Sequence, residues 1–184
     1  MTVPFPGDNP PNDNQTPDIE GAIRLLQSDD VQLRQFVAYL LGRVGDARAI
    51  EPLIDALRDE HVGVRGAAAN ALGAIGDNSA VPYILPLLKE NNPQLKVWAA
   101  YALTMLGHDR FSLIADAVQT GDVLVRRSAI LAMEQLGDQR AVAYLLKLQD
   151  DNTRRFEGDT TIAQAAAKAL TKLGYNVGRI PPKS

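Results

Sequence analysis

The sequence predicts an all-α fold, a solenoid (α-α superhelix) of about five two-helix repeats. One phrase returns along the chain, as VQLRQFVAYLLGRVGD from Val31, VGVRGAAANALGAIGD from Val62, PQLKVWAAYALTMLGH from Pro93 and VLVRRSAILAMEQLGD from Val123. Its basic residue recurs at spacings of 31, 31 and 30. Repeats of this length with helical character are typical of stacked helical hairpins. A fifth, weaker copy, IAQAAAKALTKLGY, carries the repeat's glycine at Gly174.

The repeats are preceded by a segment of different composition. Residues 1–17 contain five of the eleven prolines and almost no hydrophobic residue after Phe5. Such a segment buries too little apolar surface to offset its loss of conformational entropy. We therefore expect a disordered Pro-rich tail over 1–17, the solenoid over 18–175 and a C-terminal tail over 176–184.

Each repeat is expected to contain a helix A followed by a helix B. In the second repeat, helix A is predicted over roughly Ala49–Leu57 and helix B over roughly Val62–Ile75. Good N-cap residues stand one residue before helix B in the other repeats: Asp30, Asn92 and Asp122. Glycines suited to a left-handed C-cap follow helix B: Gly45, Gly76, Gly107 and Gly137. An aspartate after three of them (Asp46, Asp77, Asp138) is placed to cap the next helix A.

Counting from the basic residue of each repeat, as position 0, separates core from surface. Positions +3, +6, +7 and +10 are apolar in all four strong copies and share one helical face, so we expect them in the core. They are Val37, Ala68, Ala99 and Ala129; Leu40, Ala71, Ala102 and Ala132; Leu41, Leu72, Leu103 and Met133; and Val44, Ile75, Leu106 and Leu136. Positions +1, +2, +5, +8 and +9 vary in character and are free for function.

Composition excludes several classes of function. The net charge of −3 gives no general attraction for nucleic acid, and the chain contains no cysteine for disulfides, thiolate chemistry or metal ligation. No apolar run approaches the ~20 residues of a membrane span, and the N-terminus does not resemble a signal peptide. We expect a cytoplasmic protein without a membrane span. The two histidines, His61 and His108, have no third ligand nearby, so no metal site is expected.

The segment VRGAAANALGAIGDNSAVPYILPLLKENN resembles the short HEAT-like repeat of the phycobilisome-lyase type, over about residues 18–175. The resemblance implies a HEAT/armadillo-like solenoid. Its members include the two subunits of E/F-type bilin lyases and proteins implicated in phycobilisome turnover. Another HEAT-like family, deoxyhypusine hydroxylase, binds iron through paired His-Glu motifs. Those pairs are missing here, where the chain has only Glu60-His61 and His108-Asp109.

The recurrent basic residues are interpreted as a structural ladder: Arg34, Arg65, Lys96 and Arg126. A role at every repeat boundary predicts recurrence in every copy, through pairing with acids or carbonyls such as those of Asp29 or Asp59. The alternative is a basic surface for a phosphate or an acidic partner.

The aromatic residues suggest a binding face. Repeats 1 and 3 carry aromatic pairs at positions +2 and +5 of helix B, whereas repeat 2 has only small or polar residues there. If these positions line the concave side, they form a shallow trough suited to a partner's helix or a flat conjugated ligand. The alternative is that Phe36 and Trp98 pack between layers. The predicted partner-binding residues are Tyr39, Asn70, Trp98, Tyr101, Phe36 and Arg127. A second candidate contact surface is the loop containing Arg154, Arg155 and Phe156.

The sequence contains no recognisable catalytic set. It favours a non-enzymatic scaffold or adaptor that binds a protein partner on its concave face and needs no cofactor. By resemblance, that partner belongs to phycobilisome or phycobiliprotein assembly or turnover. The alternative is a subunit of an E/F-type bilin lyase/isomerase, which would hold a bilin and form a heterodimer with another HEAT-like subunit. A third possibility is an assembly factor for another complex.

Overall fold

The structure is a computed structural model that describes residues 18–153 and 160–175. The predicted tails, 1–17 and 176–184, lie outside the described residues, as does the loop segment with Arg154, Arg155 and Phe156. Within the described ranges the regular elements are all helical, which confirms the predicted fold class.

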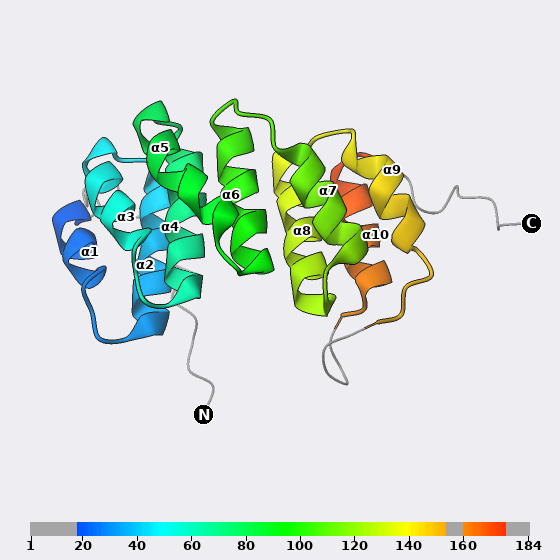
Figure 1. Ribbon diagram of the computed structural model, residues 1–184, viewed down its shortest axis with the longest axis horizontal. Coiled ribbons are helices and arrows are strands. Elements are labelled where there is room, and N and C mark those ends of the chain that lie inside the picture. Colours follow the sequence, from blue (N-terminus) through cyan, green and yellow to red (C-terminus); the bar gives the residue numbers. More distant parts are fainter. Residues whose placement is uncertain (1–17, 154–159, 176–184) are drawn as a thin grey trace, which may run out of the picture.

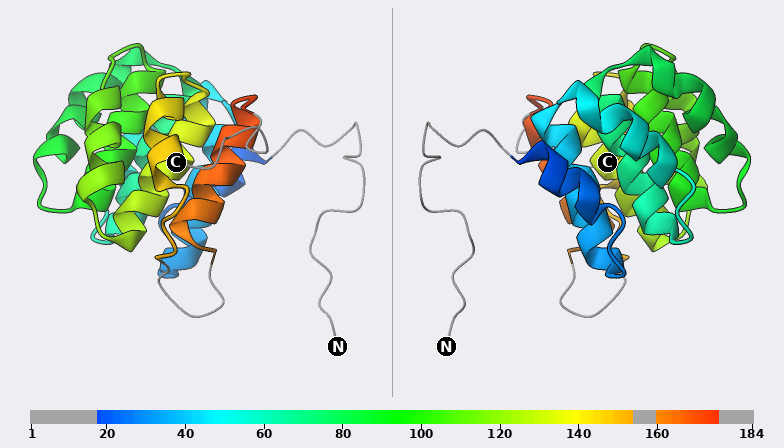
Figure 2. Two further views of the ribbon diagram at one scale, coloured as in Figure 1. Left: turned by 90° about the vertical axis from the view of Figure 1, so that its right-hand side faces the viewer. Right: turned by 90° about the vertical axis from the view of Figure 1, so that its left-hand side faces the viewer.

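Five helical hairpins follow one another along the chain (Figure 1). The B helices are α2 (Val31–Val44), α4 (Val62–Ile75), α6 (Pro93–Met105), α8 (Val123–Leu136) and α10 (Ile162–Lys172). The A segments are α1 (Ile19–Leu25), η1–α3 (Ala47–Ala49, Ile50–Ala56), η2–α5–η3 (Asn78–Ala80, Val81–Ile84, Leu85–Lys89), α7 (Phe111–Thr120) and α9–η4 (Ala141–Leu145, Leu146–Leu148). Viewed from its ends, the molecule shows A and B segments in two layers (Figure 2).

The predicted caps define the ends of the B helices. The side chains of Asp30, Asn92 and Asp122 each accept a hydrogen bond from a backbone N–H in the first turn. In the second repeat His61 takes this place and accepts from the Gly63 N–H at 3.2 Å. The glycines after the B helices have left-handed φ angles of 66–85°, where a side chain would be strained.

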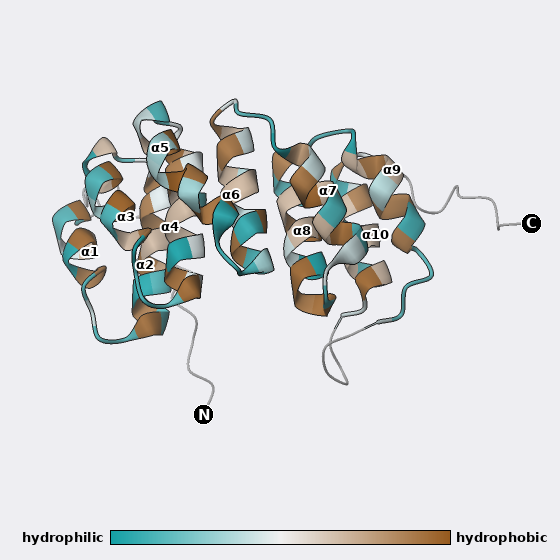
Figure 3. Cartoon of the chain, viewed as in Figure 1, coloured by the Kyte–Doolittle hydropathy of each residue, from teal (hydrophilic) through white to brown (hydrophobic). Residues whose placement is uncertain are grey.

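The core lies between the two layers, and apolar and polar residues alternate along each helix (Figure 3). Positions +3 and +7 of the four strong repeats are all buried. Two residues of the first repeat that were expected in the core are instead exposed: Leu40 at 36% and Val44 at 47%. Because no repeat precedes α2 within the described residues, nothing there covers the outer side of this helix.

Glycine sets the spacing between the first B helices. A Cβ atom on Gly42 would lie 2.5 Å from the Cα of Ala71, and one on Gly73 would lie 2.8 Å from the Cα of Ala102. Position +8 therefore has to be glycine for α2, α4 and α6 to pack this closely. In the third repeat the same position is Thr104. A visible interval separates the ribbons of α6 and α8 in Figure 1.

The buried apolar residues form two clusters that meet at α6. One extends from α1 to α6 and includes Leu72 and Leu103, and the other extends from α6 to α10 and includes Tyr101 and Met133. The α6–α8 boundary is therefore the place where the hydrophobic core of the solenoid divides.

Candidate functional site

The first residue of the basic ladder is an inter-repeat clamp. The guanidinium of Arg34 donates to both carboxylate oxygens of Asp59, at 2.8 and 3.0 Å, and to the carbonyl of Ser28 at 2.7 Å. A planar guanidinium matches a carboxylate in this two-bond arrangement. The Arg34 side chain is only 9% exposed and Asp59 12% exposed. The pair ties the first hairpin to the second, and the bond to Ser28 fixes the loop between α1 and α2.

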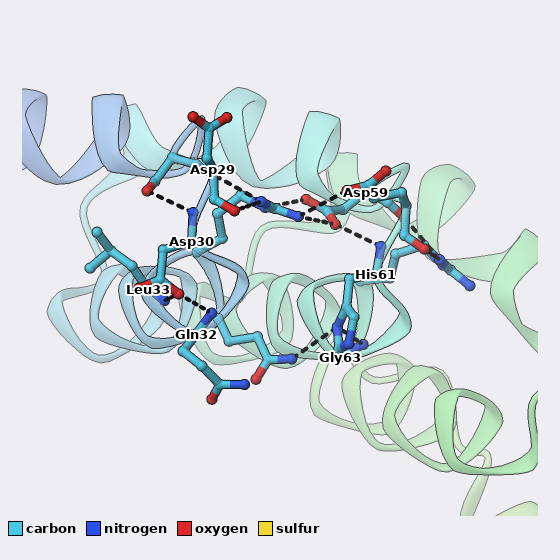
Figure 4. A network of polar contacts seen from close by, with 12 residues as sticks. Asp29, Asp30, Gln32, Leu33, Asp59, His61 and Gly63 are labelled. Carbon is cyan, nitrogen blue, oxygen red and sulfur yellow. Dashed lines mark hydrogen bonds and ion pairs between the residues drawn. The ribbon is translucent and has the colours of Figure 1, made fainter.

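Asp59 is itself held in place by the next B helix (Figure 4). Its carboxylate accepts from the His61 N–H at 2.8 Å, and the His61 ring nitrogen Nδ1 lies 3.1 Å from the Gln35 side-chain amide. Burial raises the pKa of Asp59, but the hydrogen bonds from Arg34 and His61 outweigh it, so the net shift is downward. A carboxylate in this setting stays ionised and is engaged within the fold.

The clamp recurs in two further repeats. Arg65 donates to Glu90 at 2.7 Å and to the carbonyl of Asp59 at 2.8 Å. Arg126 pairs with Asp151 and donates to the carbonyl of Val118 at 3.1 Å. The pKa of Asp151 falls to about 2, chiefly through the Thr153 hydroxyl and also through Arg126.

The third ladder residue, Lys96, has no clamp of this kind among the described residues. The clamping acid stands 25 residues after its arginine at Asp59, Glu90 and Asp151, whereas the corresponding residue for Lys96 is Gly121. Among the residues that the structure describes, this brace is therefore absent at the same α6–α8 boundary where the core divides. At these three positions the guanidinium is engaged in contacts between successive hairpins.

A hollow of about 130 Å³ lies across the B helices. It brings together three of the residues proposed for partner binding, Tyr39 from α2, Asn70 from α4 and Tyr101 from α6. Arg43 and Gln135 complete its polar wall, with the Arg43 guanidinium 6.0 Å from the centre of the Tyr39 ring. Sequence reasoning overlooked these two residues, although both stand at the variable position +9.

Tyr101 corrects the sequence-based interpretation of position +5. We expected its side chain to be exposed on the face like that of Tyr39, but it is 5% exposed, whereas Tyr39 is 46% exposed. Tyr101 belongs to the apolar cluster shared with α7 and α8, where the wider helix spacing admits a large ring. Burial raises the pKa of its hydroxyl. It contributes to the bottom of the hollow and to the core.

The two aromatic residues at position +2 do not join the hollow. Trp98 is half-buried, contacts the backbone region of Gly66 and makes an edge-to-face contact with Tyr101, with ring centroids 6.1 Å apart. Phe36 is 57% exposed on the first B helix. The trough with two matched aromatic walls is therefore absent from this arrangement.

Arg127 lies in a second groove, between α8 and α10, of about 260 Å³. Leu131 and Ala165 contribute apolar surface there. Glu134, with a side chain only 5% exposed, accepts from Lys172 at 2.5 Å and lies 3.9 Å from Lys168. Arg127 donates to the Thr160 carbonyl at 3.2 Å. This groove carries more positive than negative charge.

Two further findings on the described residues concern metal binding and membrane insertion. No group of three or more metal-ligating side chains lies close enough to hold an ion within these ranges. None of the helices in the same ranges is both long and apolar enough to cross a membrane.

Comparison with known families agrees with the repeat architecture. The family model for HEAT repeats matches residues 19–104 and 81–170, and the two matches together span most of the chain. The chain belongs to the HEAT-repeat family. No curated protein sequence is significantly similar to it.

Two solved structures illustrate the similarity. The complex of CpcE and CpcF of phycocyanin lyase from Nostoc sp. PCC7120 aligns with a TM-score of 0.51 and 29% identity, covering 92% of this chain and 70% of the other. Human deoxyhypusine hydroxylase aligns with a TM-score of 0.50 and 20% identity, covering 84% of this chain and 73% of the other. The second similarity shows the shared fold alone, and the first agrees with the predicted resemblance to the phycobilisome-lyase type.

Proposed function

We propose that this protein is a non-enzymatic scaffold that binds a segment of a partner protein along the face of its B helices. The observation that carries the proposal is the hollow that Tyr39, Asn70, Tyr101 and Gln135 form across four successive B helices. It continues into exposed apolar side chains at positions +5 and +9, such as Leu131 and Met105. An elongated apolar strip of this kind suits an amphipathic helix of a partner.

The charges on this face indicate what kind of segment fits. Positions +1, +5, +8 and +9 of the five B helices carry the cations Arg43, Arg127, Lys168 and Lys172. Their one acid is Glu134, which is already engaged by two lysines. We therefore propose an acidic amphipathic helix as the bound element, because charge complementarity speeds association and fixes orientation.

The similarity to a phycocyanin lyase complex supports a partner from the phycobiliprotein system. The proposed ligand for a first experiment is an apo-phycocyanin subunit, with binding measured by isothermal titration calorimetry. Tyr39→Ala should weaken binding about tenfold, since exposed aromatic residues at the centre of an interface commonly contribute most. Arg58→Ala, which is exposed on the A side next to α3, serves as the control and should bind normally. Unchanged binding by Tyr39→Ala would exclude the B-helix face as the contact surface.

The second candidate function is a subunit of an E/F-type bilin lyase/isomerase. The similar structure is itself a complex of two proteins, which favours a heterodimer with another HEAT-like subunit. In that case the two subunits together bind the bilin. The test measures the rate of bilin attachment to an apo-phycobiliprotein by absorbance. One mixture contains this chain alone, and the other contains this chain together with a second HEAT-like subunit. Acceleration by the pair alone supports the lyase subunit, whereas no acceleration in either mixture supports the scaffold.

A further inference from the structure

The outer side of α2 carries an apolar stripe at the N-terminal end of the solenoid. Phe36, Leu40 and Val44 are 57%, 36% and 47% exposed. They follow one another at intervals of four residues and therefore lie on one side of the helix. We call these three residues the α2 end face. The right-hand view of Figure 2 shows this end of the molecule, with α1 and α2 in shades of blue.

The same positions are covered in the inner repeats. Ala71 and Ala102, which correspond to Leu40, pack against Gly42 and Gly73 of the preceding B helix. Trp98 and Ser128 correspond to Phe36. Trp98 lies against Gly66 of the preceding helix, and Ser128 accepts a hydrogen bond at 3.1 Å from Gln94. The α2 end face therefore corresponds to one half of a helix-to-helix interface, and residues 18–153 and 160–175 do not supply the other half.

The opposite end of the solenoid does not supply that half. The side of α10 that faces away from α8 exposes Gln164 and Thr171, with Lys168 beside them. Packing Phe36 and Leu40 of another copy on these polar residues would bury groups without partners, which is unfavourable. Head-to-tail stacking of copies is therefore disfavoured. The same face of a second copy offers an apolar surface that lacks these polar groups.

Charges at the two ends of α2 support such a self-pairing. Asp29 and Asp30 are exposed at its start, and Arg43 is exposed in its last turn. A two-fold axis perpendicular to α2 makes the two copies of this helix antiparallel, so the acidic start of each lies toward the basic end of the other. The helix dipoles are then also opposed.

We propose that the α2 end face forms a symmetric homodimer, with α2 packed antiparallel against α2 of a second copy. The occupant is a second copy because the stripe is apolar along its length and the acidic start of each α2 meets the basic end of the other in an antiparallel pair. A contact between single helices is at the small end of specific interfaces, so the dimer is weak, with a dissociation constant in the micromolar range. The α2 end face shares no residue with the B-helix face, and of the dimer contacts only Arg43 also lines the hollow.

Sedimentation equilibrium of the full chain tests the proposal over roughly 5 to 500 µM, a range set by the expected affinity. The expected result is a concentration-dependent shift from the 19.9 kDa monomer to a dimer. Leu40→Glu should raise the dissociation constant at least tenfold while its circular dichroism spectrum stays unchanged. The matched control is Leu113→Glu, an exposed leucine on α7 at 41%, which should dimerise like the parent chain.

A charge exchange tests the antiparallel geometry. Arg43→Glu alone should weaken the dimer, and combining it with Asp29→Arg should restore it, because the two changes invert both members of the predicted contact. A full chain that stays monomeric at the highest concentration overturns the proposal. So does a dimer that tolerates Leu40→Glu or that Leu113→Glu disrupts equally, since the interface would then lie elsewhere.

Discussion

At the scale of single residues, equivalent positions of the repeats have different roles because their neighbours differ. Tyr39 and Tyr101 both stand at position +5 of a B helix, yet one is exposed and the other is buried. The difference comes from the helix that follows. Gly42 lets α4 approach α2 closely, whereas α6 carries Thr104 at the same position and leaves room for a tyrosine ring before α8.

The burial of Tyr101 leads to a stability prediction. Tyr101→Ala should lower the free energy of unfolding by about 3 kcal/mol, because truncating a buried aromatic leaves a cavity. Tyr39→Ala should change it by less than about 0.5 kcal/mol, as is usual for an exposed site. Urea denaturation followed by circular dichroism measures both values. Equal effects of the two substitutions would contradict the assignment of Tyr101 to the core.

The clamp between Arg126 and Asp151 predicts a pH dependence. The pKa of Asp151 is lowered from 3.8 to about 2 in the folded protein. Its contribution to stability is therefore complete above the unfolded-state value and is lost as the pH falls through the folded value. Between about pH 5 and pH 2, Asp151→Asn should lose less stability than the parent chain does. Asp116→Asn, on the exposed side of α7, is the control and should follow the parent curve in thermal melts.

At the scale of elements, the sequence predicts the B helices better than the A segments. The second B helix is found over the predicted range, because its apolar period and terminal glycine agree, although His61 replaces the capping residue of the other repeats. Helix A of that repeat is instead divided into η1 and α3. In the third repeat Pro86 has no N–H to donate, and Val81–Ile84 is followed there by a 3-10 segment. Periodicity alone does not specify such changes of helix type.

The candidate site was only partly predictable for a related reason. Tyr39, Asn70 and Tyr101 occupy the same position in successive repeats, and this equivalence correctly predicts that they lie around one hollow. It did not give the distance between neighbouring helices, which depends on the contact of two side chains from different repeats. For that reason only the structure shows that Tyr101 is buried and that Phe36 and Arg127 lie outside the hollow.

Helix spacing itself can be tested at Gly73. Replacing an interior helical glycine by alanine normally stabilises a helix by up to about 1 kcal/mol. Here the new Cβ would meet the backbone of Ala102 at 2.8 Å. We expect Gly73→Ala to lower the free energy of unfolding by about 1–3 kcal/mol, as overpacked cores do. Chemical denaturation checks this, and a variant more stable than the parent would show that α4 and α6 can separate freely.

At the scale of the whole molecule, the divided core and the missing clamp coincide at the α6–α8 boundary. Stability in repeat proteins depends on interfaces between neighbours, so a weaker interface limits how far a disturbance spreads. The residues before and after this boundary should therefore behave as two partly independent cooperative units.

Hydrogen exchange followed by mass spectrometry tests this division. Leu72→Ala, in the first core cluster, should cost about 2–5 kcal/mol and reduce amide protection mainly in α2 and α4. Met133→Ala, in the second cluster, should reduce it mainly in α8 and α10. Uniform loss of protection along the chain in both variants would show that the boundary transmits stability fully.

The clamp also determines which hairpins can stand next to each other. Each arginine is met by an acid from the following hairpin, and each glycine at position +8 by an alanine at +6 of the following helix. Residues 46–76 contain Asp59 and Ala71, which contact the preceding hairpin. They also contain Arg65 and Gly73, which make the same two contacts with the following hairpin. A duplicate of this segment inserted after Gly76 would find compatible neighbours on either side. The array can thus be lengthened by a whole hairpin, and its surface extended, without a new kind of joint.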